Sequence, residues 1–383
     1  MTRPVVCARR AVVALLAAGL VSGCGSQPAR VAAPAVHLVI PPLSTSLVTA
    51  QGTWAIAVMG GSAASENNFW QLFVRPAGAS RWSLVTPPAV ADNGGLVAAG
   101  GPGSMLIGFR PSQGLVYSPL AASTDAGRTW SPGLLDAALA DVPDGISVSP
   151  SGQVLALLTD GAIQTAASAA AAAAGQWSPL TTRDALAASA PGRSCGLLDV
   201  NAVSFWLNKT DPVAAGSCER PGVAGVFADN GGIWRAAGPA VPGSWARRQV
   251  QVLGLGSTAG GNVALLLAGS ELIAAWSTGS GWSTSGVLGG VAGVRAAGFG
   301  AGGSAWVLLG GGRAETIGGP GSAWRALPAV PAGTATLAPG AAGSFDALAV
   351  AGARLTVWQA GAGAAAWTKA QAITVPIEYG SSS

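Results

Sequence analysis

Charged side chains are scarce in this sequence: Asp, Glu, Lys and Arg together make up 9% of its 383 residues. Disordered chains are usually polar or strongly charged, so this composition excludes a largely disordered protein. If residues 1–23 are removed, as argued below, the formal charge of +4 falls, leaving 17 basic against 16 acidic residues. A near-neutral chain lacks the basic patch that nucleic acids require, and we expect no nucleic-acid partner.

Histidine and tyrosine are also rare, with one and two residues. The single histidine, His37, excludes His-based catalytic triads and multi-histidine metal sites, and we expect neither a metal nor another cofactor. The Gly-rich stretches read as β-turns without a helix after them, so neither a phosphate-binding P-loop nor a dinucleotide-binding loop is predicted.

Glycine and tryptophan are abundant, with 57 and 14 residues. Many turn-forming residues among short apolar segments are typical of an all-β protein. Residues 250–270, the longest charge-free candidate for a membrane span near the middle of the chain, contain a Ser-Thr-Ala-Gly-Gly turn. Two strands are therefore expected there rather than a helix.

The N-terminus has the pattern of an export signal. Three arginines fall within residues 1–10, an apolar run covers residues 11–21, and Val-Ser-Gly leads to Cys24. A basic region, an apolar region and small residues at the cleavage point define a secretory signal. A cysteine directly after small residues resembles the bacterial lipobox, which implies a diacylglycerol thioether on Cys24. An ordinary signal peptide with an incidental cysteine is the alternative.

Three segments follow from this interpretation. Residues 1–23 are a lipoprotein signal peptide, and residues 24–36 comprise the lipidated cysteine and a Pro/Ala-rich tether. Residues 37–383 form the folded domain. The acyl chains on Cys24 would anchor the protein in the lipid bilayer on the extracytoplasmic face of the cell membrane.

Residues 123–130 read S-T-D-A-G-R-T-W. Asp125 and Gly127 favour a tight turn, because an Asp side chain accepts hydrogen bonds from nearby N–H groups and Gly tolerates positive φ. Trp130 then opens a strand with a ring large enough to pack between sheets. With Ser123 at its start, this pattern resembles the Asp-box, or BNR repeat, of sialidase-type and sortilin-type β-propellers. The resemblance implies a structural role for these residues.

Tryptophans that follow small-residue turns recur along the chain at near-regular intervals. They are Trp82, Trp130, Trp177, Trp234, Trp282, Trp324 and Trp367, at intervals of 48, 47, 57, 48, 42 and 43 residues. A partial box keeps Asp229, Gly231 and Trp234. A period near 40–50 residues is typical of propeller blades, whereas chance recurrence in a Trp-rich sandwich is the alternative.

A short apolar segment precedes each tryptophan and reads as the second strand of its blade. These segments are residues 54–58, 105–109, 154–158, 202–207, 263–267, 305–309 and 346–350. They predict an all-β, seven-bladed β-propeller of four-stranded antiparallel blades. The blade number stays open, since residues 36–41 and 373–377 would supply a closing strand. Residues 166–174 are expected to form an irregular Ala-rich loop, with a helical turn as the alternative.

Cys195 and Cys218 are the cysteines that remain once Cys7 is cleaved off and Cys24 is lipidated. In an exported protein two such cysteines most simply form a disulfide, with two free buried thiols as the alternative. We place Cys195 at the start of the inner strand of blade four and Cys218 in the loop after its second strand. Both positions belong to the same rim.

The interval before Trp234 is about ten residues longer than its neighbours, and we expect the extra residues in a loop over residues 208–221. Its charged residues make it a candidate ligand contact on the rim where propellers usually bind. The rim candidates are Lys209, Asp211, Glu219 and Arg220 in the loop, Arg183, Asp184 and Arg193 at the entry to the blade, and Glu66 in blade one. Solvated loop residues that keep the domain soluble are the alternative interpretation.

Fold resemblance does not give function. Sialidase chemistry needs an arginine cluster, a Tyr–Glu pair and an acidic Asp, and neither Tyr117 nor Tyr379 has matching neighbours. We therefore expect a membrane-anchored, non-catalytic lipoprotein whose propeller binds or scaffolds a protein or glycan. A hydrolase acting on glycans or lactones at the central channel is the alternative. An assembly factor for a membrane complex is a third hypothesis.

Overall fold

The computed structural model describes residues 46–60, 68–87, 96–101, 103–109, 120–131, 143–206, 211–258, 261–277, 281–300 and 302–376. The predicted signal peptide, Cys24 and the tether lie outside these ranges. Within the described ranges, no helix has the length and apolar character needed to cross a membrane.

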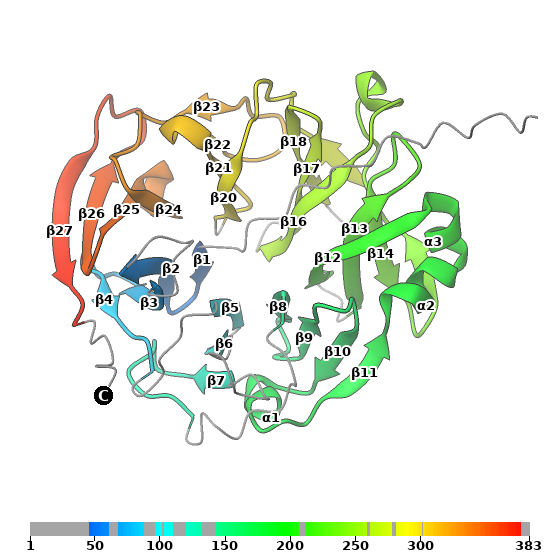
Figure 1. Cartoon of the computed structure of the whole chain (residues 1–383), viewed down its shortest axis with the longest axis horizontal. Helices are drawn as coiled ribbons and strands as arrows, with labels where there is room; N and C mark the ends of the chain where they lie inside the picture. The colour runs from blue at the N-terminus through cyan, green and yellow to red at the C-terminus, as the bar shows by residue number, and fades with distance from the viewer. Residues whose placement is uncertain are drawn as a thin grey trace, which may run out of the picture. The chain divides into compact units, whose positions relative to one another are not determined.

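Seven antiparallel sheets surround a central axis and form a seven-bladed β-propeller, as predicted (Figure 1). The first three blades comprise β1 (Ser46–Thr49), β2 (Gly52–Gly60), β3 (Asn68–Pro76) and β4 (Ser83–Leu84); β5 (Leu96–Gly101), β6 (Ser104–Phe109) and β7 (Leu120–Ser123); and β8 (Gly145–Val148), β9 (Val154–Leu157), β10 (Ile163–Ala166) and β11 (Ser178–Thr181).

The remaining blades each have four strands. They comprise β12 (Leu197–Phe205), β13 (Pro212–Cys218), β14 (Gly225–Asp229) and β15 (Trp234–Ala236); β16 (Gln251–Thr258), β17 (Gly261–Ala268), β18 (Glu271–Ser277) and β19 (Trp282–Thr284); β20 (Val294–Phe299), β21 (Ala305–Leu309), β22 (Ala314–Ile317) and β23 (Arg325–Ala326); and β24 (Thr334–Pro339), β25 (Phe345–Ala351), β26 (Arg354–Ala360) and β27 (Thr368–Thr374).

Short helices lie in the connections. They are α1 (Ala169–Ala173), α2 (Arg183–Ala188) and α3 (Ala190–Cys195), with 3₁₀ turns η1 (Gly243–Trp245), η2 (Gly310–Gly312) and η3 (Ala341–Gly343). Helix α1 shows that the preferred expectation for residues 166–174, an irregular loop, is wrong and that its alternative, a helical turn, forms there. Ser168 is the N-cap of α1 and accepts a hydrogen bond from Ala171 N. Because alanine is also the strongest helix former, this run forms a helix.

Each blade uses consecutive strands, ordered from the centre of the ring outward. Because the strands are antiparallel, the connections of every blade lie at the two opposite ends of its strands, which we call the crossover edge and the hairpin edge. The crossover edge holds the connections between blades and the turns between second and third strands; in blade four these are residues 182–196 and 219–224. The hairpin edge holds the other turns, which in blade four include Trp206, Asp211 and residues 230–233.

The core consists of seven apolar clusters, one between each pair of neighbouring blades. The second strands contribute most to them: β17 is buried along its whole length, and so is β21. Each buried Val or Leu side chain stabilises the fold by roughly 1.5–3 kcal/mol. The strand bounds confirm six of the seven predicted second strands; the exception is in blade four.

Most of the recurrent tryptophans lie at or just before the start of a described outermost strand, and four of the seven fasten their blade to the preceding one. Four indole N–H groups donate to the backbone just after the preceding outer strand: Trp130 to Val85 O, Trp282 to Ala237 O, Trp324 to Gly286 O and Trp367 to Pro328 O, at 2.7–3.1 Å. Trp177 differs, because its indole donates to Ala172 O of α1 in its own blade. The period seen in the sequence is thus the period of the inter-blade contact.

The strand assignment expected for blade four is wrong. Residues 202–205 belong to the inner strand β12, and residues 212–218, half of the loop expected over residues 208–221, form the second strand β13. The extra residues of this blade lie earlier, in α2 and α3, which precede β12. Several apolar stretches of similar length follow one another here, so a fixed period aligned the wrong one with the second strand.

Candidate functional site

Residues 182–196, the blade-four insertion, connect blade three to blade four. Among the blade connections that the structure describes, this is the one that contains α-helices. Thr182 caps α2 by accepting from Ala185 N at 3.1 Å. Ser189 ends α2 and caps α3, accepting from Gly192 N at 3.2 Å. Gly196 closes α3 in the left-handed region, with φ 66°. These capping residues explain why two helices of only six residues each form here.

A disulfide between Cys195 and Cys218 holds the insertion against the end of β13, as the sequence predicts, with a Cα–Cα distance of 5.2 Å. Two backbone hydrogen bonds flank it: Glu219 N donates to Gly196 O at 2.8 Å, and Arg220 N donates to Cys195 O at 3.1 Å. The insertion and the β13–β14 turn therefore form one fastened surface, which we call the blade-four rim (residues 182–196 and 219–224).

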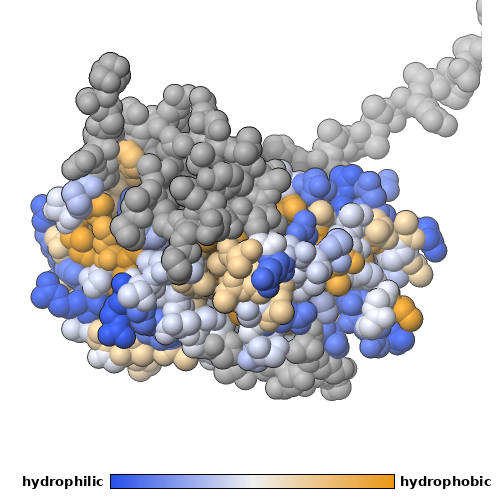
Figure 2. Space-filling view, turned by 90° about the horizontal axis from the view of Figure 1, so that it is seen from below, coloured by the Kyte–Doolittle hydropathy of each residue, from blue (hydrophilic) through white to orange (hydrophobic). Residues whose placement is uncertain are grey.

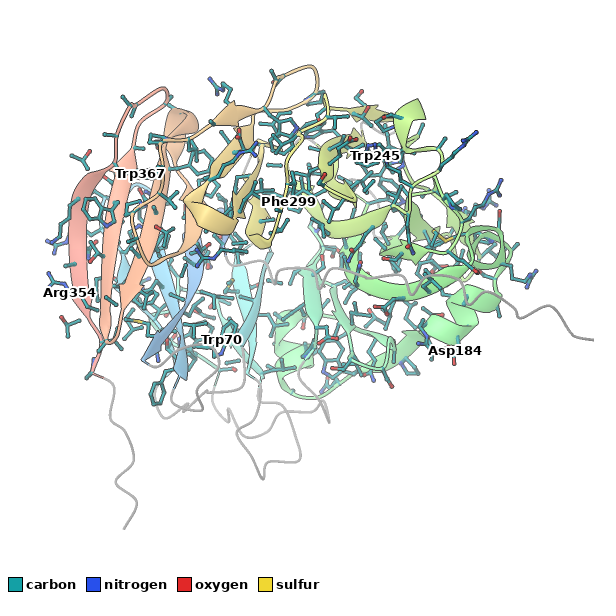
Figure 3. All side chains as sticks on the ribbon, turned by 45° about the horizontal axis from the view of Figure 1, so that its top comes forward. Trp70, Asp184, Trp245, Phe299, Arg354 and Trp367 are labelled. Atoms are coloured by element: carbon teal, nitrogen blue, oxygen red, sulfur yellow. A yellow bond between two sulfur atoms is a disulfide. The ribbon has the colours of Figure 1, made fainter. Side chains whose placement is uncertain are left out.

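The structure brings five of the predicted rim residues to this surface. Arg183 and Asp184 lie on α2, Arg193 lies on α3, and Glu219 and Arg220 begin the β13–β14 turn; all five are exposed. Figure 3 shows Asp184 on the outer side of the insertion.

Asp211 is separated from this group. It precedes β13 and therefore lies on the hairpin edge, opposite the rim on which it was expected. The cause is the misplaced strand, which reverses the edge assigned to this turn. Lys209 and Glu66 lie outside the described residues.

The charges on the blade-four rim are only weakly paired. Arg183 and Asp184 form an ion pair of 2.8 Å, yet 45% and 82% of their side chains remain exposed. The hydrogen bond to Asp184 raises the pKa of the Arg183 guanidinium, and the Asp199 carboxylate adds to this effect. Arg193 donates to Ala188 O. Water screens such exposed pairs, so these side chains are available to a partner at small cost.

The inner strands that surround the channel contain few charged residues. As the structure describes them, the seven strands include one acidic residue, Asp199, and one basic residue, Arg295, both near the crossover edge. Arg295 donates to Thr334 O at 3.2 Å. Deeper along the inner strands, Phe299 packs over Gly254 and Gly256 of the neighbouring strand (Figure 3).

The described residues contain no group of three or more His, Cys, Asp or Glu side chains arranged to hold a metal ion. Seen edge-on, the described surface has hydrophilic patches toward both flanks, with pale and hydrophobic areas beside and between them (Figure 2).

Asp125 organises the turn over residues 123–130. Its carboxylate accepts from Thr129 N at 2.8 Å and from Thr129 Oγ1 at 2.6 Å, and Ser123 Oγ lies 2.9 Å away. These hydrogen bonds, led by that of the Thr129 hydroxyl, lower the pKa of Asp125 to about 2. Gly127 has φ 77°, which explains the glycine at this position. The carboxylate is thus used within its own turn, on the hairpin edge.

Asp229 has a similar local role. It is buried, and it accepts a hydrogen bond from Gly232 N at 2.9 Å in the turn that leads to Trp234. Gly231 lies in the left-handed region, with φ 64°. Both predicted Asp-containing turns therefore have structural hydrogen bonds on the edge opposite the blade-four rim.

Sequence reasoning missed a buried ion pair between blades one and seven. Arg75 Nη1 donates to Asp346 Oδ2 at 2.5 Å, and the indole of Trp82 donates to the same oxygen at 2.7 Å. Burial raises the pKa of Asp346, while Arg75 and Trp82 oppose that shift. A lone aspartate at the start of an apolar strand was the available signal.

No protein-family model matches the chain. No curated protein matches it either. Similar solved structures include YCF48 bound to a D1 peptide, at 15% identity and a TM-score of 0.44 over 81% of this chain and 90% of that one. A protein from Lactobacillus plantarum has 10% identity and a TM-score of 0.48 over 84% and 96%. The Aleuria aurantia lectin with α-methyl-L-fucoside has 13% identity and a TM-score of 0.38 over 75% and 96%. Likeness at this level carries no functional conclusion, and the fold assignment rests on the sheet order.

Proposed function

We propose that this chain is an extracytoplasmic lipoprotein, anchored through acylated Cys24, whose propeller binds a protein or glycan partner at the blade-four rim without catalysis. The observation that supports binding is the rim itself. In the described part of this charge-poor ring, the crossover into blade four has a helical insertion, fastened by a disulfide and backbone hydrogen bonds, with five exposed charged side chains on the rim. A rigid surface of this kind loses little conformational entropy on binding.

The channel gives less support to the hydrolase alternative. Glycoside hydrolysis commonly uses two carboxylates that flank the scissile bond. The inner strands in the described part of the chain supply Asp199 alone. Exposed charges that form no strong pairs are typical of a recognition surface instead.

The anchor is tested separately from the ring. The Cys24→Ala variant should move from the membrane fraction to the soluble extracytoplasmic fraction and should lose incorporation of a labelled fatty acid, because the thioether attachment point is gone. A Cys7→Ala variant is the matched control and should behave as the wild type. Continued incorporation of the labelled fatty acid into Cys24→Ala would contradict the lipid anchor.

The rim is tested by cross-linking in intact cells, followed by identification of the partner. The triple variant Arg183→Glu, Arg193→Glu, Arg220→Glu should lose the cross-linked partner. Arg235→Glu, on the hairpin side of the same blade, is the control and should retain it. Recovery of a membrane complex would favour the assembly-factor hypothesis as the identity of the partner. Equal cross-linking in both variants would refute a partner site at the rim.

A further inference from the structure

A groove of about 810 Å³ lies on the hairpin edge of blades six, seven and one. Three turns line it: Gly302 and Ser304 in blade six, residues 339–345 in blade seven and residues 76–79 in blade one. It lies on the edge of the ring opposite the blade-four rim. It therefore requires an explanation independent of the function proposed above.

The exposed charges described around this groove are all positive. Arg325 lines the groove, Arg81 follows residues 76–79, and Lys369 stands near the start of the outer strand of blade seven; all three are exposed and form no described ion pair. On the hairpin edge of these three blades, the one carboxylate among the described residues is Asp346, with a side chain 3% exposed. Arg325 thus offers an unpaired cation in the groove lining, Arg81 and Lys369 offer two more on the same edge outside the lining, and the described residues of this edge offer no accessible acid.

Arg75 forms part of the groove lining but is already engaged. Its guanidinium pairs with Asp346, lies 3.3 Å from Pro339 O and sits 5.4 Å from the ring centroid of Trp82. The buried carboxylate balances the charge of Arg75. Arg75 therefore supports the lining, and attraction of an anion falls to Arg81, Arg325 and Lys369.

The groove walls favour a polypeptide over a sugar. Glycine is frequent in the lining, and a Cβ placed on Gly302 would meet no atom within 4 Å, so backbone groups and open space face the groove there. Phe345, the one aromatic residue of the lining, is only 4% exposed. Sugar rings usually stack on exposed aromatic faces, whereas an extended peptide can lie against backbone.

We propose that this groove binds an extended acidic segment of a partner polypeptide. The carboxylates of the segment contact Arg325, Arg81 and Lys369, and its backbone lies along the glycine-rich turns. Electrostatic complementarity of this kind increases the association rate and selects acidic over neutral sequences.

The test uses the full chain in detergent and a labelled peptide of alternating Glu and Gly, with a Gln–Gly peptide for comparison. Fluorescence anisotropy should show binding of the Glu peptide alone, weakening when NaCl rises from about 50 to about 500 mM. The Arg81→Glu, Arg325→Glu double variant should bind about tenfold more weakly or worse. Arg128→Glu and Arg235→Glu, on the same edge of blades two and four, are matched controls and should bind as the wild type.

A steric variant tests the groove without changing its charge. Gly302→Trp should abolish binding, because its side chain would enter open space in the groove. Gly281→Trp is the control, since a Cβ there is equally free and the residue lies on the same edge in blade five. Equal affinity for both peptides, unchanged binding by the charge or groove variants, or equal competition by a polyuronate of the same charge would each overturn the proposal.

Discussion

Arg75 and Asp346, 271 residues apart in the chain, form an ion pair of 2.5 Å where the first and seventh blades meet. Gln371 lies nearby, accepting from Trp82 N and donating to Trp82 O, both at 2.9 Å. Each blade is built from consecutive strands, so the described ring closes without a shared strand, through side-chain contacts and a backbone hydrogen bond from Gly60 N to Gly352 O at 3.0 Å. Residues 373 and 374, considered as a closing strand, belong to β27 of blade seven itself. Residues 36–41 lie outside the described ranges.

This closure predicts a strong coupling between the two blades. Asp346→Ala should lower the free energy of unfolding by about 3 kcal/mol, because Arg75 would be left buried without its partner. Arg75→Met should cost less, since burial already raises the pKa of Asp346 and favours its neutral form. Guanidinium unfolding of both single variants and the double variant measures the coupling.

The exposed pair on α2 is the control for this measurement. Asp184→Ala should leave the unfolding midpoint unchanged, because both side chains of its pair are largely solvated. Additive effects of the Arg75 and Asp346 substitutions would show that the ion pair does not couple the blades.

The inter-blade tryptophans predict a second effect. Trp282→Phe keeps an aromatic ring in the cluster between blades four and five but removes the donor to Ala237 O. The loss should be about 1 kcal/mol of unfolding free energy, with faster amide hydrogen exchange at that interface. Trp206→Phe is the matched control, because that ring contacts Trp282 and its N–H has no described acceptor. If Trp282→Phe and Trp206→Phe lost equal unfolding free energy, the loss would come from the smaller ring rather than from the missing hydrogen bond.

The turn at Asp125 predicts a pH dependence. The pKa of Asp125, about 2 in the folded chain, is below its ordinary value of 3.8, so the ionised carboxylate stabilises the folded state. Its contribution is complete above the ordinary value and is lost as the pH falls toward about 2. Thermal unfolding from pH 6 downward should therefore show a gap between wild type and Asp125→Ala that closes in this range. A difference in thermal stability between wild type and Asp125→Ala that stays constant with pH would mean that the charge of Asp125 does not stabilise the fold.

The disulfide predicts a redox-dependent stability. Cys195 and Cys218 are separated by 23 residues, and closing a loop of this size stabilises by about 3 kcal/mol in the chain-entropy model. Reduction by dithiothreitol should lower the unfolding midpoint and speed hydrogen exchange in α2 and α3. The Cys195→Ala, Cys218→Ala variant should resemble the reduced protein and should not respond to dithiothreitol.

The propeller could be predicted because its signals are local and repeated. The spacing of residues such as Trp130 and Trp282 persists through large changes in the intervening sequence, since each indole must reach the preceding blade. Blade four departs from the prediction because its insertion, α2 and α3, offsets the following strands from the sequence repeat. Apolar stretches such as β12 and β13 are alike as sequence, and only pairing between strands distinguishes inner from second.

The sequence alone determined the propeller class and the Asp-containing turns, and it predicted seven blades and the cysteine pair, because turn chemistry, strand burial and repeat length act within short segments. Only the tertiary structure decided which edge each charged residue occupies. Asp211 lies on the hairpin edge, and Arg325 lines a groove on that edge, with Arg81 and Lys369 on the same edge of blades one and seven. The Arg75–Asp346 pair was equally invisible, because closing a ring joins its first and last blades across nearly the whole chain. Contacts at that separation follow from the geometry of the closed ring rather than from any local pattern.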